Sequence, residues 1–135
     1  MSFLTRWWYV LTRNRFARPM WERAVIVSFD DHQISATYPP SARSPHGQTQ
    51  AIAWADVTCL AIETNSSGPS GADFWYLLEG EGGKLCAFPL GAAGGGEAVA
   101  EFSKRFPEFD GEAFRNAIGS TTEARFVCWK RGGGE

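Results

Sequence analysis

Residues 74–90, FWYLLEGEGGKLCAFPL, carry the clearest structural signal of the chain. Two apolar segments, Phe74–Glu79 and Lys84–Leu90, flank the short link Gly80-Glu-Gly-Gly83. A tight Gly-rich link between two apolar runs is typical of a β-hairpin. The stretch therefore predicts two antiparallel strands, and we expect each of them to bury one face.

Alternating apolar and polar residues predict further strands on both sides of this hairpin. They cover residues 21–29, 34–38, 49–54, 57–64 and 124–130. Trp54 and Trp129 are expected to anchor the core. Asp56 is expected to cap the turn that follows Trp54.

Helical spacing replaces the strand pattern after the hairpin. Val99, Phe102 and Phe106 share one face of an expected helix that ends at Pro107. Asp110 is a natural N-cap for a second short helix. The sequence thus places two short helices between the hairpin and the last strand.

Residues 1–20 carry a helical pattern of a different kind. At about 100° per residue, one side of this helix is apolar and the other carries Thr and Arg. The apolar side consists of Phe3, Leu4, Trp7, Trp8, Val10 and Leu11. Residues 1–23 contain five arginines and one glutamate, whereas the rest of the chain carries eight basic and fourteen acidic side chains. The pattern predicts a basic amphipathic helix joined to an acidic remainder.

These elements predict an α+β fold in a single domain, and 135 residues are enough to bury one core. We expect a mostly antiparallel sheet of about six to seven strands, with the amphipathic helix at the N-terminus and the two short helices near the C-terminus. The expected organisation is a basic helix over residues 1–20, an α+β domain over 21–131 and a frayed tail over 132–135.

The contrast between the basic arm and the acidic remainder leaves three interpretations for the arm. It packs on the sheet, docks on a partner, or lies at a membrane surface. In the last two cases the contact residues are Arg6, Trp7, Trp8 and Arg13. We do not expect nucleic acid as a partner, because the acidic remainder repels it.

The sequence contains no pattern that is typical of an active site. His32 and His46 lie in a predicted turn and a predicted loop, without a neighbouring group for acid–base catalysis. Three widely spaced cysteines form no CxxC pair, so neither a zinc site nor a redox motif is indicated. We therefore expect a protein that is not an enzyme and that uses no metal or cofactor.

The apolar run Trp7–Leu11 is far shorter than the roughly 20 residues of a membrane-spanning helix. It is also shorter than the apolar region of a secretory signal peptide. The expected compartment is the cytoplasm.

From Val25 to Arg131 the chain resembles small bacterial α+β proteins to which no activity is assigned. The resemblance is carried by Trp54-Ala-Asp-Val57, Ile62-Glu-Thr64, Gly68-Pro69, Phe74-Trp-Tyr-Leu77, Phe106-Pro-Glu-Phe-Asp110 and Phe126-Val-Cys-Trp129. Several such proteins have pleckstrin-homology-like or related folds, and some similar proteins are immunity proteins that bind and block a cognate toxin. The resemblance therefore implies a protein-binding function and no catalytic residue.

The acidic residues at predicted turns are the candidate contacts with such a protein partner. They are Asp30, Asp31, Asp73, Glu79 and Glu81. We expect them to cover a basic cleft of a toxin domain, because complementary charge speeds encounter and sets specificity. The alternative is a membrane-surface or regulatory adaptor that inserts Trp7 and Trp8 among lipid headgroups. Sedimentation with liposomes, with and without residues 1–20, separates these two hypotheses.

Overall fold

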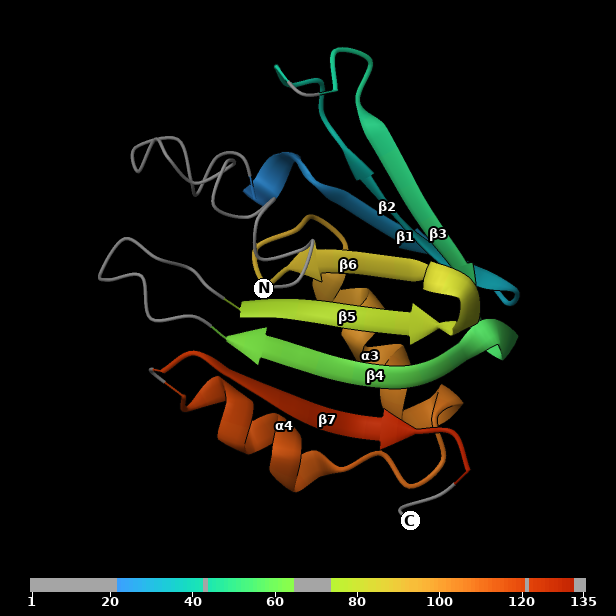
Figure 1. Ribbon diagram of the computed structural model, residues 1–135, viewed down its shortest axis with the longest axis vertical. Coiled ribbons are helices and arrows are strands. Elements are labelled where there is room, and N and C mark those ends of the chain that lie inside the picture. The colour runs from blue at the N-terminus through green and yellow to red at the C-terminus, as the bar shows by residue number, and fades with distance from the viewer. Residues whose placement is uncertain (1–21, 43, 65–73, 121, 133–135) are drawn as a thin grey trace.

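The computed structural model describes residues 22–42, 44–64, 74–120 and 122–132 (Figure 1). Within these ranges, seven strands and the helices α3 and α4 form a single α+β domain. The α+β class expected from the sequence is confirmed. The amphipathic helix expected over residues 1–20 lies outside the described ranges, as do residues 133–135 of the expected tail.

The first three strands form an antiparallel sheet in the order β1-β2-β3. They are β1 (Ile26–Phe29), β2 (Gln33–Tyr38) and β3 (Gln48–Ala53). One face is buried, with Val27, Ile34 and Ile52 at most 5% exposed, as strand periodicity requires. The strand expected from residue 21 begins instead at Ile26, because Glu22–Ala24 is helical. The Glu22 side chain accepts a hydrogen bond of 3.0 Å from the N–H of Gly91, which fixes this turn.

The other four strands form a second antiparallel sheet in the order β6-β5-β4-β7. They are β4 (Val57–Thr64), β5 (Phe74–Gly80), β6 (Leu85–Pro89) and β7 (Ala124–Lys130). We expected one sheet, and the chain forms two because a 3₁₀ turn at Trp54–Asp56 bends it between β3 and β4. A second 3₁₀ turn, Glu81–Gly83, closes the hairpin of β5 and β6, with positive φ at Gly82 and Gly83.

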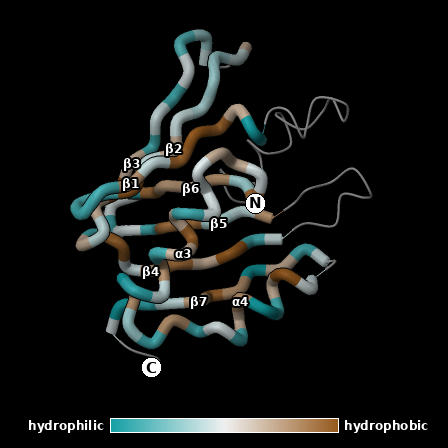
Figure 2. Tube along the Cα trace, turned by 180° about the vertical axis from the view of Figure 1, so that it is seen from behind, coloured by the Kyte–Doolittle hydropathy of each residue, from teal (hydrophilic) through white to brown (hydrophobic). Residues whose placement is uncertain are grey.

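Helix α3 (Gly95–Arg105) covers one face of the four-stranded sheet and contacts β1, and α4 (Gly111–Ile118) packs on β7 (Figures 1 and 2). The rings of Phe102 and Phe106 lie 6.5 Å and 5.9 Å from Trp54. The ring of Tyr76, on β5, lies 6.1 Å from that of Phe102. Helix α3 therefore contacts aromatic side chains of both the corner turn and the four-stranded sheet. Asp110 caps α4 as expected, because its carboxylate accepts from the N–H groups of the second and third residues that follow.

Strand β5 is buried on both faces, which corrects the expectation of one buried face. Phe74, Tyr76 and Leu78 share the face that packs toward α3. On the opposite face, Trp75 is 4% exposed and Leu77 is 1% exposed. A strand with two buried faces is apolar throughout, so its sequence shows no alternation.

The outer edge of β6 is closed by side chains of the three-stranded sheet. Gln50 accepts a hydrogen bond of 2.8 Å from the N–H of Ala87, and the Tyr38 hydroxyl donates to the carbonyl of Ala87. Pro89 has no N–H to offer at this edge. The edge of β1 is closed by Ala93, which exchanges backbone hydrogen bonds with Val25 and Val27.

Candidate functional site

Three turns from distant parts of the sequence meet at one end of the molecule, the right-hand end in Figure 1. We call this end the turn surface and define it by Asp30–His32, Trp54–Asp56 and Glu81–Lys84. The indole Nε1 of Trp54 donates to the carbonyl of Asp30 at 2.8 Å, and the N–H of Trp54 donates to the carbonyl of His32 at 3.0 Å. Lys84 Nζ lies 3.0 Å from Asp56 Oδ2. These bonds hold the three turns in one arrangement.

The first turn is held by the side chain of Asp30. Its Oδ1 accepts from the N–H groups of His32 and Gln33 at 2.8 Å and 2.9 Å. These two bonds stabilise the ionised form, so they lower the pKa of Asp30 below its usual value. The next residue, Asp31, has a 97% exposed side chain, 3.5 Å from Arg105 Nη2.

Arg105 connects this turn to the core. Its guanidinium lies 4.7 Å from the centre of the Trp54 ring, and its Nε bonds Glu101 at 3.1 Å. Arg105 Nη1 also donates to the backbone oxygen of Asp31 at 3.4 Å. The exposed carboxylate of Asp31 is therefore presented from a backbone that α3 holds in place.

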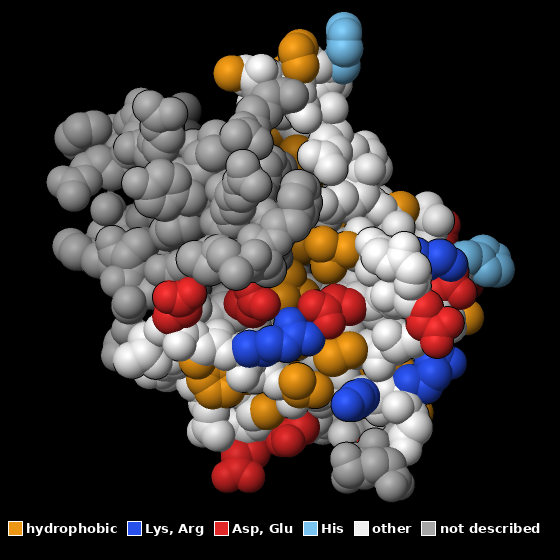
Figure 3. All heavy atoms as spheres, viewed as in Figure 1, with side chains coloured by type: hydrophobic (Ala, Val, Ile, Leu, Met, Phe, Trp, Pro, Cys, Tyr) orange, Lys and Arg blue, Asp and Glu red, His pale blue; other side chains and the backbone are white. Residues whose placement is uncertain are grey.

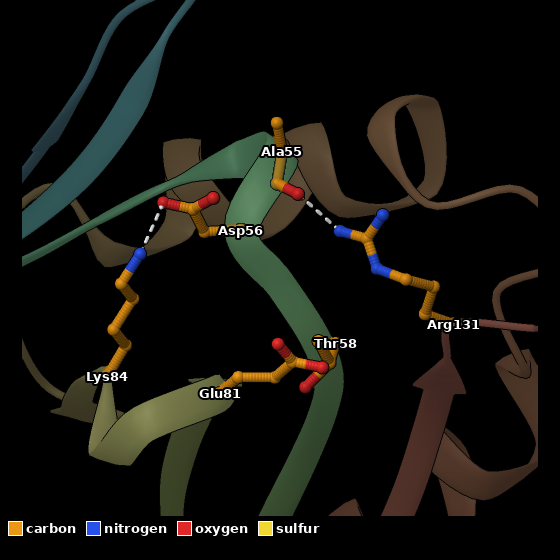
Figure 4. Close-up of a pocket in the computed structure, with 6 residues that line it drawn as sticks. All are labelled: Ala55, Asp56, Thr58, Glu81, Lys84 and Arg131. Atoms are coloured by element: carbon orange, nitrogen blue, oxygen red, sulfur yellow. Dashed lines mark hydrogen bonds and ion pairs between the residues drawn. The ribbon is translucent and has the colours of Figure 1, made fainter.

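An open pocket of about 300 Å³ lies between the second and third turns. Its lining residues are Ala55, Asp56, Thr58, Glu81, Lys84 and Arg131 (Figure 4). Arg131 Nη2 donates to the carbonyls of Ala55 and Val57, so this guanidinium is fixed by the chain that precedes β4. The carboxylate of Glu81 forms no ion pair within the described residues, and it remains available for a partner.

Asp56 does not cap its turn, which corrects the expectation from the sequence. No side chain caps the 3₁₀ turn Trp54–Asp56, and the Asp56 carboxylate pairs with Lys84. Asp56 and Lys84 are far apart in the sequence, so the residues around either turn do not predict that the two side chains pair. The pair contributes a neutral wall to the pocket.

Glu79 lies apart from the turn surface, on the outer face of the four-stranded sheet. Arg125 of β7 binds it with two hydrogen bonds, of 2.7 Å and 3.0 Å, and lies 3.4 Å from Glu63. Hydrogen bonding to Glu79 raises the pKa of Arg125. Figure 3 shows acidic and basic side chains meeting on this face. Arg125 carries no sequence signal of its own as a site residue, although the alternation in residues 124–130 places it on one face with Val127.

The structure thus places Asp30, Asp31 and Glu81 on turns at one end of the molecule and Glu79 elsewhere. Asp73 lies outside the described residues, as do the four residues proposed for a membrane or partner helix. Those are Arg6, Trp7, Trp8 and Arg13. Their contacts remain predictions from the sequence.

His32 and His46 are exposed, and burial raises the pKa of Cys86 to about 12 and that of Cys128 to about 11. Among the described residues, no three His, Cys, Asp or Glu side chains are grouped in a way that could hold a metal ion. No helix within these ranges has the length and apolar character needed to cross a bilayer.

Comparison of the chain with protein-family models, with curated proteins and with solved structures found no match.

Proposed function

We propose that this protein is a non-catalytic protein-binding module that docks a basic partner on the turn surface. In its most specific form, the proposal is an immunity protein that binds and blocks a cognate bacterial toxin. The observation that carries it is the convergence of three turns, linked through Trp54 and the Lys84–Asp56 pair, that present Asp31 and Glu81 to solvent.

The stiffness of these turns supports a docking role. A binding surface whose loops are already ordered loses less conformational entropy on association. Here the backbone of the first turn is bonded to the Trp54 indole and to Arg105. The partner therefore meets acidic groups in fixed positions.

The charge pattern supports a basic partner. The side chains of Asp31 and Glu81 are exposed, although Asp31 Oδ1 also lies 3.5 Å from Arg105 Nη2, and the other nearby cations are engaged with the protein itself. Lys84 pairs with Asp56, and one amino group of Arg131 is occupied by two backbone carbonyls. A toxin that cleaves nucleic acids or nucleotides binds its substrate in a basic cleft. Acidic groups placed over such a cleft exclude the substrate.

The test is binding to the C-terminal domain encoded by a toxin gene beside the gene for this protein. We expect a stable complex and loss of toxicity when the two are expressed together. The double variant Asp31→Lys/Glu81→Lys should slow association by about 10-fold at low salt, because it reverses the charge that steers the encounter.

A matched control is Glu123→Lys/Glu112→Lys, which makes the same change in charge at exposed residues outside the turn surface. Equal slowing by both double variants would mean that net charge, and not the turn surface, controls association. If the toxin domain forms no complex with the unmodified protein, the immunity proposal is wrong.

A further inference from the structure

The outer edge of β3 carries backbone groups that have no partner within the described ranges. The N–H of Trp54 donates to the carbonyl of His32 across the β2–β3 pair. Because backbone groups alternate in direction along a strand, Gln48, Gln50 and Ile52 direct theirs toward β2. The residues between them direct theirs outward. These are Thr49, Ala51 and Ala53. No hydrogen bond from the described residues reaches their N–H or C=O groups.

The other three edge strands are protected. Ala93 pairs with β1, and the side chains of Gln50 and Tyr38 close the edge of β6. The N–H of Asp110 donates to the carbonyl of Cys128 at 2.7 Å, and β7 itself carries the charged residues Arg125 and Lys130 and a shift of register opposite Leu60 and Ala61. Open strand edges are templates for a further strand, and proteins usually block them with charge, proline or a bulge.

The β3 edge has none of these blocks. Its sequence, QTQAIA, contains neither charge nor proline, and its register with β2 is continuous over all six residues. The β2–β3 hairpin also extends beyond the rest of the described molecule, so the upper part of β3 is open at its side (Figure 1). The edge is thus suited to accept a strand.

We propose that a second copy of this chain occupies the edge, with the two β3 strands antiparallel about a two-fold axis at Ala51. The outward groups then pair Thr49 with Ala53 of the second copy and Ala51 with Ala51 of the second copy. The two-fold axis adds the pair of Ala53 with Thr49 of the second copy, and each of the three pairs exchanges two backbone hydrogen bonds. The result is a continuous sheet of six strands, three from each copy.

The side chains beside the edge favour a second copy as the occupant. In a two-fold interface the same surface patch of both copies is in contact, so a charged edge would face a second edge of the same charge and be repelled. The outer face of the three strands is neutral in the described ranges, with Ser28 bonded to Ser35 at 3.0 Å and Thr37 to Thr49 at 3.3 Å. Figure 3 shows mainly neutral side chains over this hairpin. Ala51 adds little bulk at the axis itself.

Charge swapping at Ala51 tests this arrangement in the full chain. Ala51 is exposed, so Ala51→Lys and Ala51→Glu should both fold. By sedimentation, the unmodified protein should dimerise with rising concentration, and each variant should associate at least about 10-fold more weakly. An equimolar mixture of the two variants should regain dimerisation, since Lys and Glu then face each other at the axis.

Ser28→Lys is the matched control, because it adds the same charge to the same outer face on β1, away from the β3 edge. It should dimerise like the unmodified protein. Hydrogen exchange supplies a second readout: the amides of Thr49 and Ala51 should slow as concentration rises, while the amide of Gln50, already bonded to β2, should not change.

A protein that stays monomeric at every concentration overturns the proposal. So does a dimer that Ala51→Lys leaves intact, or a mixture of the two charged variants that fails to associate. If the unmodified chain is monomeric but binds another polypeptide through β3, and Ala51→Lys abolishes that binding, the occupant is a foreign strand and the dimer is wrong.

Discussion

The indole of Trp54 donates a 2.8 Å hydrogen bond to the carbonyl oxygen of Asp30, joining the turn after β1 to the corner between the two sheets. Trp54 is 9% exposed, and its ring also contacts Phe29, Phe102 and Phe106. One side chain therefore belongs both to the core and to the turn surface. Changes in core packing at this position should be felt at the candidate binding site.

Trp54→Phe keeps an aromatic ring in the core but removes the donor to Asp30. We expect the free energy of unfolding to fall by about 1–3 kcal/mol, the usual effect of leaving a partly buried carbonyl without its partner. Urea denaturation measures the change. Trp129→Phe is the control, because Trp129 also packs on an aromatic ring, at 4.7 Å from Phe106. A smaller loss for Trp54→Phe than for the control would contradict this role.

Two glycines at the start of α3 should respond to alanine in opposite directions. Gly94 has φ of 81°, and a Cβ there would lie 2.3 Å from the carbonyl oxygen of Val27. Gly94→Ala should therefore destabilise the protein by more than about 1 kcal/mol. Gly96 is helical with no atom within 4 Å of its would-be Cβ, so Gly96→Ala should stabilise by about 0.5–1 kcal/mol. Thermal unfolding measures the change in midpoint temperature for each variant. Midpoints that shift in the same direction would contradict this prediction.

Removal of the α4 cap should have a modest cost. Asp110 Oδ1 accepts from the N–H groups of Glu112 and Ala113, at 3.0 Å each. Asp110→Ala leaves these two donors to water and should lower the free energy of unfolding by about 1 kcal/mol. Asp110→Asn retains an acceptor and should lose much less. Equal losses for the two variants would mean that the charge, and not the hydrogen bonds, stabilises this end of the helix.

The ion pair of Arg125 and Glu79 should be worth more than that of Lys84 and Asp56. Arg125 binds with two hydrogen bonds and is 39% exposed, whereas Lys84 makes one contact and is 55% exposed. Double-mutant cycles with Arg125→Met/Glu79→Gln and Lys84→Met/Asp56→Asn measure the two coupling energies. We expect about 0.5–1 kcal/mol for the first pair and less than about 0.5 kcal/mol for the second, both reduced by salt. The reverse order would show that geometry does not govern these pairs.

The buried thiol of Cys86 should make the protein sensitive to alkali. Burial raises its pKa from 9.0 to about 12, so above pH 9 the unfolded chain loses a proton that the folded chain keeps. The contribution is complete below pH 9 and falls by about 1.4 kcal/mol per pH unit as the pH rises toward 12. Cys86→Ser, which does not ionise there, should flatten the fall in unfolding free energy between pH 9 and pH 11. An unchanged slope would assign the alkaline loss to other groups.

Features encoded by neighbouring residues were predictable from the sequence. Residues 57–64 and 124–130 are strands as expected, and Asp110 is the helix cap, since periodicity and capping depend on residues a few positions apart. The two-sheet arrangement was not predictable, because the corner at Trp54–Asp56 is set by packing against α3. Arg125 and Glu79 were missed as a pair for a related reason: they lie two strands apart, and only the sheet order brings them together.

The closure of β6 by Gln50 and Tyr38 has a consequence for how far self-association can proceed. A strand edge that stays open after each addition lets chains add without limit, which is the route to fibrils. In the proposed dimer, an antiparallel contact between two β3 strands uses the open edge of both molecules at once. The described edges that remain are covered in part by other residues or, at β7, carry charge and a shift of register, so the proposed assembly should stop at two chains.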